Sequence, residues 1–346
     1  MGQEIMRVAV YYNNSDVRVE ERPQPKVGPG ELLVKVMASG ICGSDVMEWY
    51  RVKKAPLVLG HEIAGFVVEA GPGPSQFRPG DWIVATHHVP CYSCDYCKDG
   101  NETVCDSLRS TNFEPGGFAE LVRIPKAQVE TGTLKLPEGV SFEEGTFVEP
   151  LACVVRGQRK AGMKKGKTIA VIGSGISGLL HVQLAKASGA ALVIATDISG
   201  ARLEMARKLG ADATLTADED VPARIRELNR GKGADIVIVC AAAQPAMAQA
   251  FRSADRGGHV LLFAPTKPGE TVPLPLWELW RDCVTVHTSY AGTLQDMREA
   301  LDIIAARKIN VKDMITHRLP LAQIQEGFRL VAEAKDSMKV IIEPQK

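Results

Sequence analysis

The sequence has no excess of charge of either sign, because 41 lysines and arginines stand against 41 aspartates and glutamates. A neutral chain has no overall attraction for nucleic acid or anionic lipid, so we expect a small-molecule partner. No uninterrupted apolar run approaches the ~18 residues that cross a bilayer, and the first residues lack a basic region followed by an apolar core. We therefore expect a cytoplasmic protein without membrane association.

The chain also lacks internal repeats, low-complexity tracts and long linkers. Its 346 residues correspond to about two domains at roughly 150 residues per domain. Eight cysteines are the compositional anomaly. Because a reducing compartment disfavours disulfides, these cysteines favour metal binding instead.

Residues 168–289 alternate short apolar runs with helical patterns, which is typical of a parallel sheet with crossover helices. Six strands are expected, which is the full count of a doubly wound nucleotide-binding domain. They lie at residues 168–172, 191–196, 213–216, 235–241, 259–264 and 284–290. We predict an α/β Rossmann domain over residues 155–290.

The remaining residues have a different pattern. Residues 1–154 contain short β-type runs interrupted by Gly and Pro, without regular helices between them. Two amphipathic helices are expected near residues 294–307 and 321–335, followed by the apolar run KVIIEP. That run has no strand partner nearby in sequence, so we expect it to return to the first domain, which then comprises residues 1–154 and 291–346.

A glycine motif joins the first Rossmann strand to the helix that follows it. Gly173, Gly175 and Gly178 form G-x-G-x-x-G, in which they allow a tight turn, close approach of a pyrophosphate and close helix packing. With Ile176, they are the expected contacts to a dinucleotide at the helix N-terminus. The alternative, a glycine turn that binds no nucleotide, is disfavoured by the strand and helix on either side.

Asp197 ends the second expected strand, 19 residues after Gly178. A carboxylate at this place accepts hydrogen bonds from the ribose hydroxyls and repels a 2′-phosphate, which favours NAD over NADP. Arg202 is close enough in sequence to favour the phosphate instead. We give more weight to Asp197, because it stands at the strand end itself.

Four of the eight cysteines fall within fifteen residues. Their C-x2-C-x2-C-x7-C spacing suits a closed tetrahedral zinc site that holds a loop in shape. A redox pair or an iron–sulfur cluster is disfavoured, because the lobe is rich in Gly, Asp and Asn and follows a strand. The expected structural zinc ligands are Cys91, Cys94, Cys97 and Cys105.

Further motifs in the β-rich domain are Cys42 in GICGSD, His61-Glu62 in GHEIAG and Glu149 in EPL. In this order, with the cysteine lobe and the glycine turn, they resemble the zinc-dependent medium-chain dehydrogenases. The resemblance covers essentially the whole chain and is to the polyol branch, which includes sorbitol (L-iditol) and threonine dehydrogenases. It implies a GroES-like fold for the β-rich domain, and oxidation of a secondary alcohol to a ketone with NAD.

The resemblance also implies a catalytic zinc held by Cys42, His61 and a carboxylate. In this branch Glu149 takes the place of a second thiolate, whereas Glu62 binds directly or exchanges with it. One thiolate, one carboxylate and a neutral imidazole cancel the charge of Zn²⁺ and leave a fourth position open. Asp45 is implied to orient the imidazole.

Among the remaining cysteines and histidines, only Cys153 is considered as an alternative zinc ligand. Cys153 lies four residues after Glu149 and is a rival ligand, although a small buried residue is the simpler interpretation. We expect Cys240 and Cys283 in the core. Six histidines fit no metal spacing: His87, His88, His181, His259, His287 and His317.

The resemblance assigns Ser44 as the first acceptor of the alcohol proton. Many relatives continue the relay with a histidine five residues after the zinc cysteine, where this chain has Met47. Methionine carries no proton, so the path must run elsewhere. The absence of that histidine also disfavours threonine dehydrogenase.

The substrate is the least defined part of the prediction. Candidate pocket walls are Trp49, Tyr50, Phe113 and Trp277, although aromatic residues are as often core. The loop Arg51–Lys54 suits an anionic substrate or, more simply, solvent. We predict a polyol-like substrate, with aminocyclitol (scyllo-inosamine-type), sugar-phosphate and threonine dehydrogenases as alternatives.

Two rivals from other classes are disfavoured. One is a non-catalytic nucleotide-binding member of the fold, which the complete ligand set Cys42, His61, Glu62 and Glu149 opposes. The other is a zinc-free enone reductase, which lacks the cysteine lobe. The resemblance implies a homodimer or homotetramer.

Overall fold

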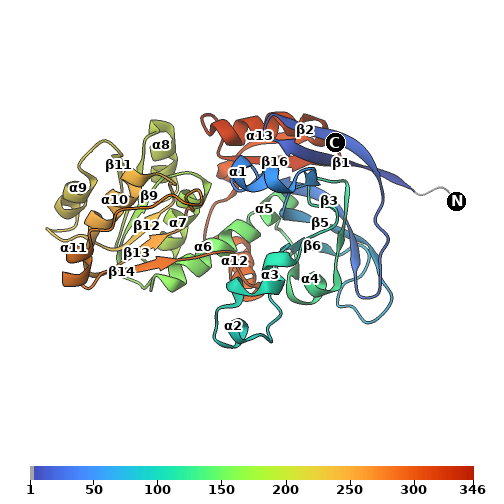
Figure 1. Cartoon of the computed structure of the whole chain (residues 1–346), viewed down its shortest axis with the longest axis horizontal. Coiled ribbons are helices and arrows are strands. Elements are labelled where there is room, and N and C mark those ends of the chain that lie inside the picture. Colours follow the sequence, from blue (N-terminus) through green and yellow to red (C-terminus); the bar gives the residue numbers. More distant parts are fainter. Residues whose placement is uncertain (1–3) are drawn as a thin grey trace. The chain divides into compact units, whose positions relative to one another are not determined.

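The computed structural model describes residues 4–346 and divides into two compact units. The β-rich unit contains the chain up to Ala152, together with Ala291–Ala306 and Val311–Lys346. The α/β unit contains Cys153–Tyr290 and Arg307–Asn310. The chain therefore leaves the β-rich unit and returns to it (Figure 1).

The α/β unit is built on a parallel six-stranded sheet in the order β11-β10-β9-β12-β13-β14. This confirms the predicted doubly wound Rossmann sheet. The strands are β9 (Thr168–Ile172), β10 (Leu192–Asp197), β11 (Ala213–Thr216), β12 (Ala234–Val239), β13 (Ala254–Leu262) and β14 (Thr285–Thr288).

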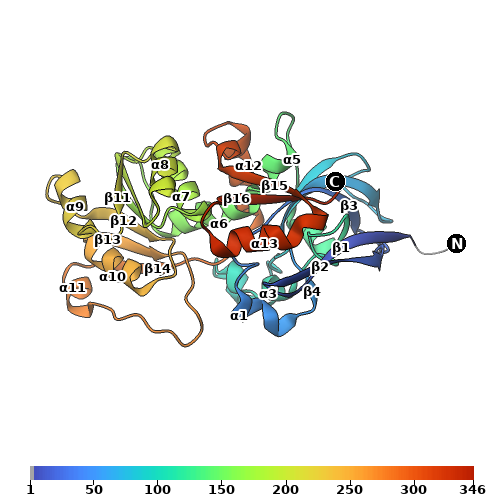
Figure 2. The same cartoon turned by 90° about the horizontal axis from the view of Figure 1, so that it is seen from above.

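Helices connect these strands and cover the sheet (Figure 2). They are α7 (Ile176–Ala187), α8 (Gly200–Lys208), α9 (Val221–Leu228), α10 (Gln244–Ser253) and α11 (Leu276–Arg281). Apolar residues of α9, α10 and α11 share one core cluster with the strands. Every residue of β9 is buried, as a central strand covered on both faces requires.

The β-rich unit contains a sheet in the order β15-β16-β3-β5-β6-β8, in which β7 also pairs with β3. A second, three-stranded sheet has the order β2-β1-β4. The expected runs become β3 (Leu32–Gly40), β5 (Glu62–Ala70), β6 (Trp82–Ala85) and β7 (Leu121–Ile124). The others are β1 (Ile5–Asn13), β2 (Asp16–Pro23), β4 (Leu57–Val58), β8 (Thr133–Lys135), β15 (Ile315–Pro320) and β16 (Lys339–Glu343).

The last strand, β16, pairs antiparallel with β3, so the final apolar run returns to the first part of the chain as expected. The expectation that it has no partner nearby in sequence was wrong, because β15 pairs with it in parallel. The sequence of β15, ITHRLP, exposes Thr316 and Arg318, and these polar residues conceal the strand signal. Both expected helices form, as α12 (Leu294–Ala305) and α13 (Ile324–Glu333).

Most other helices of the β-rich unit are a single turn or little more. They are α1 (Glu48–Arg51), α2 (Asp95–Lys98), α3 (Asp106–Ser110), α4 (Lys126–Thr131) and α5 (Phe142–Gly145). The longer α6 (Val148–Lys160) contains the boundary between the two units. Among the described residues, every helix is too short or too polar to cross a membrane.

Candidate active site

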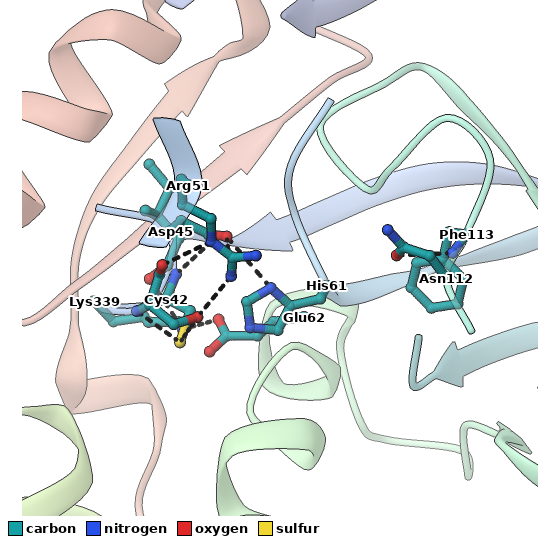
Figure 3. Close-up of polar contacts among 10 residues, drawn as sticks. Cys42, Asp45, Arg51, His61, Glu62, Asn112, Phe113 and Lys339 are labelled. Atoms are coloured by element: carbon teal, nitrogen blue, oxygen red, sulfur yellow. Dashed lines mark hydrogen bonds and ion pairs between the residues drawn. The ribbon is translucent and has the colours of Figure 1, made fainter. Parts of the chain in front are cut away.

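Three side chains of the β-rich unit converge at the ends of β3 and β5. The two strands pair so that Gly40 lies opposite Glu62. Cys42 follows β3 by two residues and His61 directly precedes β5, so the same pairing brings both beside Glu62. Ligand atoms of Cys42, His61 and Glu62 lie within 4.8 Å of one another (Figure 3). Sulfur, imidazole and carboxylate at these separations suit Zn²⁺.

A tight turn after β3 places Asp45 next to Cys42 and His61. Asp45, which is fully buried, accepts a hydrogen bond from the Cys42 backbone at 3.0 Å, and its other oxygen lies 3.4 Å from Nδ1 of His61. With Nδ1 facing Asp45, Nε2 is the ring nitrogen left for a metal. Asp45 thus stands where an orienting partner of a ligand histidine is needed.

The charges around His61 favour a cation in this place. Burial opposes charge on the ring, but Asp45 and Cys42 outweigh it and raise the pKa of His61 well above its usual value. Burial likewise opposes charge on Asp45, yet His61 and Arg51 keep the pKa of Asp45 below its usual value. The anions that hold a proton on His61 suit a metal ion equally well.

Arg51 closes the turn from the other side. Its guanidinium donates to the Ser44 carbonyl at 2.9 Å and to Ser44 Oγ at 3.0 Å, and it lies 3.6 Å from Asp45. The expectation of a solvated loop therefore does not hold for Arg51, because its side chain is only 14% exposed. Lys53 and Lys54 of that loop are exposed.

The carboxylate of Glu62 has a charged neighbour that the sequence did not reveal. Lys339, the first residue of β16, is 1% exposed, and its ammonium contacts the Glu62 carboxylate (Figure 3). Its Nζ also lies 3.5 Å from the Ile41 carbonyl. Gly40 leaves room for the pair, since a Cβ there would lie 2.2 Å from Glu62 and 2.6 Å from Lys339.

Glu149 and Cys153 lie outside this group. Glu149 is in the first turn of α6, and among the described residues the group of candidate ligands contains Glu62 and not Glu149. Cys153, further along α6, belongs to neither group of candidate metal ligands in the part of the chain that the structure describes. Ser44 Oγ lies 3.4 Å from the Cys42 sulfur, next to the converging ligands.

The second cluster is the cysteine lobe, where Cys91, Cys94, Cys97 and Cys105 have sulfurs within 4.8 Å of one another. Two sulfur pairs are 3.6 Å apart, far longer than the ~2.05 Å of a disulfide. Four sulfurs at about 2.3 Å from zinc lie about 3.8 Å from each other, so the lobe has the dimensions of a closed zinc site.

Hydrogen bonds tune these thiols. Ser93, through its side chain and backbone, and the Cys94 backbone lower the pKa of Cys91 to about 5. Burial raises the pKa of Cys97 to about 12. A zinc ion shared by all four sulfurs would remove this difference in pKa between the thiols, since zinc binds each cysteine as a thiolate.

The glycine turn of the α/β unit has the shape of a phosphate-binding loop. Gly173 has φ +94°, and a Cβ on Gly178 would lie 1.9 Å from the Gly173 carbonyl, so both positions require glycine. A Cβ on Gly175, the N-cap of α7, would meet nothing within 4 Å. This open approach leads to the backbone N–H groups that begin with Ile176.

Asp197 is tied to this turn. Its carboxylate accepts from the Ser174 backbone at 2.7 Å and from the Ser199 backbone at 2.9 Å, and Arg202 lies 3.8 Å away. Each carboxylate oxygen keeps a lone pair for a further donor, such as a ribose hydroxyl.

Known proteins share both units. The family described as alcohol dehydrogenase GroES-like domain matches residues 28–138, and the family described as zinc-binding dehydrogenase matches residues 177–306. A sorbitol dehydrogenase from Gallus gallus is 33% identical over 328 residues, covering 92% of this chain and 91% of the relative. The chain belongs to the zinc-dependent medium-chain dehydrogenase family.

Solved structures agree with this membership. A protein described as a zinc-binding dehydrogenase from Sinorhizobium meliloti 1021, crystallised with NADP, superimposes with a TM-score of 0.89 at 31% identity. The match covers 99% of this chain and 100% of that one. An alcohol dehydrogenase from Thermus sp. ATN1 gives a TM-score of 0.87 at 29% identity, over 98% and 99% of the two chains. The chain is thus an oxidoreductase that uses zinc and a nicotinamide dinucleotide, and its β-rich unit has the predicted GroES-like fold.

Several residues of this dehydrogenase differ from expectation. Cys283 is exposed and not core, because it occupies a left-handed turn (φ 53°) between α11 and β14. Of the expected pocket walls, Phe113 is 4% exposed, whereas Trp277 is 61% exposed on α11. Trp49 is half-buried and Tyr50 is 37% exposed. His87 and His88 received no role, yet the His87 ring lies beside His61, and the His88 ring lies beside His87.

Proposed function

We propose that this dehydrogenase oxidises a secondary alcohol of a polyol-like substrate to a ketone, with NAD as the hydride acceptor. The convergence of Cys42, His61 and Glu62 supports this most directly, because one thiolate, one imidazole and one carboxylate form a neutral zinc site with an open position. The relative from Gallus gallus is a sorbitol dehydrogenase, and another relative, 33% identical over 343 residues from Aspergillus clavatus, is described as D-xylulose reductase A.

Zinc, when bound, supplies positive charge that favours loss of the hydroxyl proton of the substrate. The protein contributes the alignment: Asp45 fixes the His61 ring, and the turn at residues 42–45 places Ser44 beside the ligands. Ser44 receives the hydroxyl proton, while the carbon-bound hydrogen leaves with its electron pair for C4 of the nicotinamide. The products are a ketone, NADH and one proton.

We assign Glu62 as the third zinc ligand and Glu149 as the carboxylate that exchanges with it. Support comes from the grouping of Glu62 with Cys42 and His61. The contact with Lys339 gives Glu62 an alternative partner, so the carboxylate has somewhere to go when it leaves the metal. Met47, at the N-cap of α1, offers no group for proton transfer.

We further propose NAD as the preferred dinucleotide. Asp197 is 6% exposed and stands at the end of β10, where its charge opposes a 2′-phosphate. Arg202 lies 3.8 Å from the Asp197 carboxylate and partly offsets that charge. Gly173, Gly175, Ile176 and Gly178 form the pyrophosphate site.

The proposal extends to a homo-oligomer in the cytoplasm. The strand β14 is at the edge of the parallel sheet, and α11 before it exposes Leu276, Trp277 and Trp280. An edge strand beside exposed apolar side chains suits pairing with a second copy. The eight cysteines, all within the described residues, form no disulfide, which suits a reducing compartment.

A substrate panel tests the reaction. NADH formation is followed by its absorbance. The panel contains polyols, cyclitols, phosphorylated sugars, threonine and simple alcohols, each with and without a chelator. We expect chelator-sensitive oxidation of a polyhydroxylated secondary alcohol. Activity confined to primary alcohols of the ethanol type would contradict the proposal.

A further inference from the structure

The side chain of Ser44, which receives the substrate proton in the proposed reaction, lies between a cation and a candidate zinc ligand. Its Oγ is 3.0 Å from Nη2 of Arg51 and 3.4 Å from the sulfur of Cys42. The same guanidinium donates from Nε to the Ser44 carbonyl at 2.9 Å. Arg51 therefore holds both the backbone and the hydroxyl of Ser44.

The direction of the hydrogen bond between Arg51 and Ser44 follows from the two groups themselves. A guanidinium has five N–H donors and no acceptor, whereas a hydroxyl has one hydrogen and two lone pairs. Ser44 Oγ must therefore accept from Arg51, which occupies one of these lone pairs. The hydrogen and the second lone pair of Ser44 point elsewhere, and the sulfur of Cys42 lies within their reach.

Arg51 is itself held on two further sides, so its guanidinium has a defined position. Nη2 lies 3.6 Å from the buried carboxylate of Asp45, and the guanidinium carbon lies 4.8 Å from the centre of the Tyr50 ring (Figure 3 shows Arg51 beside Asp45). A planar guanidinium in such a setting loses little freedom when it forms one more hydrogen bond. A serine hydroxyl without such a partner rotates to suit any group nearby.

We propose that Arg51 is a positioning residue that fixes the orientation of the Ser44 hydroxyl at the candidate metal site. It occupies one lone pair of Ser44 and leaves the other lone pair and the hydrogen for the oxygen of a bound alcohol. Arg51 cannot take the proton further, because a guanidinium has no acceptor, so its role is orientation and not relay. The inference rests on the proposed role of Ser44 and adds the group that orients it.

A double-mutant cycle tests whether Arg51 acts through Ser44. In Arg51→Met, we expect kcat for sorbitol oxidation to fall on the order of 100-fold, with KM changed far less, since small misplacements of a reacting group are costly. In a Ser44→Ala background, which has no hydroxyl to orient, the same replacement should lower kcat by less than about threefold. A residue that only supports the fold would lower kcat equally in both backgrounds.

Two further variants separate orientation from packing. Arg51→Lys keeps a single charged donor group and should recover part of kcat. Arg18→Met is the matched control, because Arg18 also pairs with a carboxylate, that of Asp16 at 2.6 Å, and also lies 4.8 Å from the centre of a tyrosine ring, that of Tyr12. It should leave kcat unchanged. Zinc content and the thermal unfolding midpoint show that each variant is folded and loaded.

The conformation of Ser44 provides a second measurement, which needs no turnover. Crystal structures should show Ser44 in one rotamer in the zinc-loaded wild type and in more than one rotamer in Arg51→Met. Equal losses of kcat in the two backgrounds, or the same single Ser44 rotamer in Arg51→Met, overturn the inference. Failure of the proposed function has a different signature, because the wild-type enzyme then oxidises no secondary alcohol in the panel, whereas the comparison of rotamers still applies.

Discussion

At the scale of single residues, the contact between Glu62 and Lys339 links the metal site to the last strand. Both side chains are almost fully buried, so the loss of one leaves an uncompensated charge inside the protein. A bound zinc ion provides Glu62 with another cation. The pair should therefore matter most when the metal is absent.

We predict that Lys339→Met destabilises the zinc-free protein by about 3–5 kcal/mol and the zinc-loaded protein by clearly less. Thermal unfolding with and without chelator measures both. The double variant Lys339→Met/Glu62→Gln is the matched control and should recover much of the zinc-free stability. Equal destabilisation with and without zinc would show that the contact has no connection with the metal.

Asp197 is the residue that should select the dinucleotide. Replacement of Asp197 by Ser removes the charge that opposes a 2′-phosphate and leaves Arg202 to attract it. The ratio of kcat/KM for NADP to that for NAD should rise on the order of tenfold, which corresponds to about 1.4 kcal/mol.

The double variant Asp197→Ser/Arg202→Ala should lose most of that gain. An unchanged ratio in Asp197→Ser would mean that another residue chooses between the cofactors.

The single residues that sequence reasoning missed are those whose role depends on distant partners. Lys339 is 277 positions from Glu62, and nothing in the run KVIIEP marks its lysine as buried. Arg51 was placed in a basic loop because Lys53 and Lys54 follow it in the sequence, yet its guanidinium turns back to Ser44. In contrast, the four lobe cysteines were predictable because they lie close together in sequence, and the place of Asp45 was implied by the family resemblance.

At the scale of elements, the cysteine lobe cannot be stable without its metal. Its helices α2 and α3 have four and five residues, far below the length at which a helix is stable alone. Its core consists of Cys97, Cys105 and Leu108, packed against Cys94 and Ala291. Zinc must therefore provide most of the order.

We predict that Cys97→Ser lowers the zinc content from about two to about one per chain and speeds amide exchange across residues 91–110. Exchange in the six-stranded sheet of the α/β unit should stay slow. Exchange followed by mass spectrometry measures both regions. A lobe that stays protected after loss of its zinc would contradict the structural role.

Strands were predictable where both faces are buried and less so at edges. The apolar run of β9, and the alternation of such runs with helical patterns along the chain, identified the Rossmann sheet. The strand β15 was missed, because an edge strand with exposed polar residues resembles a loop. The hairpin of β1 and β2 was also missed, since most of β2 is exposed.

At the scale of the whole molecule, the exposed face of α11 and β14 predicts self-association. Trp280 is 70% exposed and its ring lies 5.4 Å from that of Trp277. Trp280→Glu should shift the protein toward monomers in sedimentation equilibrium. Tyr96→Glu, at an aromatic residue 55% exposed in the cysteine lobe, is the control and should not. A wild-type protein that is monomeric at all concentrations would contradict the proposed oligomer.

The most direct test measures zinc content and catalytic activity in the same two variants. Zinc per chain and polyol oxidation are measured for Cys42→Ser and for Cys153→Ser, the rival thiol. The account predicts about one zinc and no NADH from Cys42→Ser, against about two zinc and wild-type activity from Cys153→Ser. Two zinc ions and full activity in Cys42→Ser would contradict it.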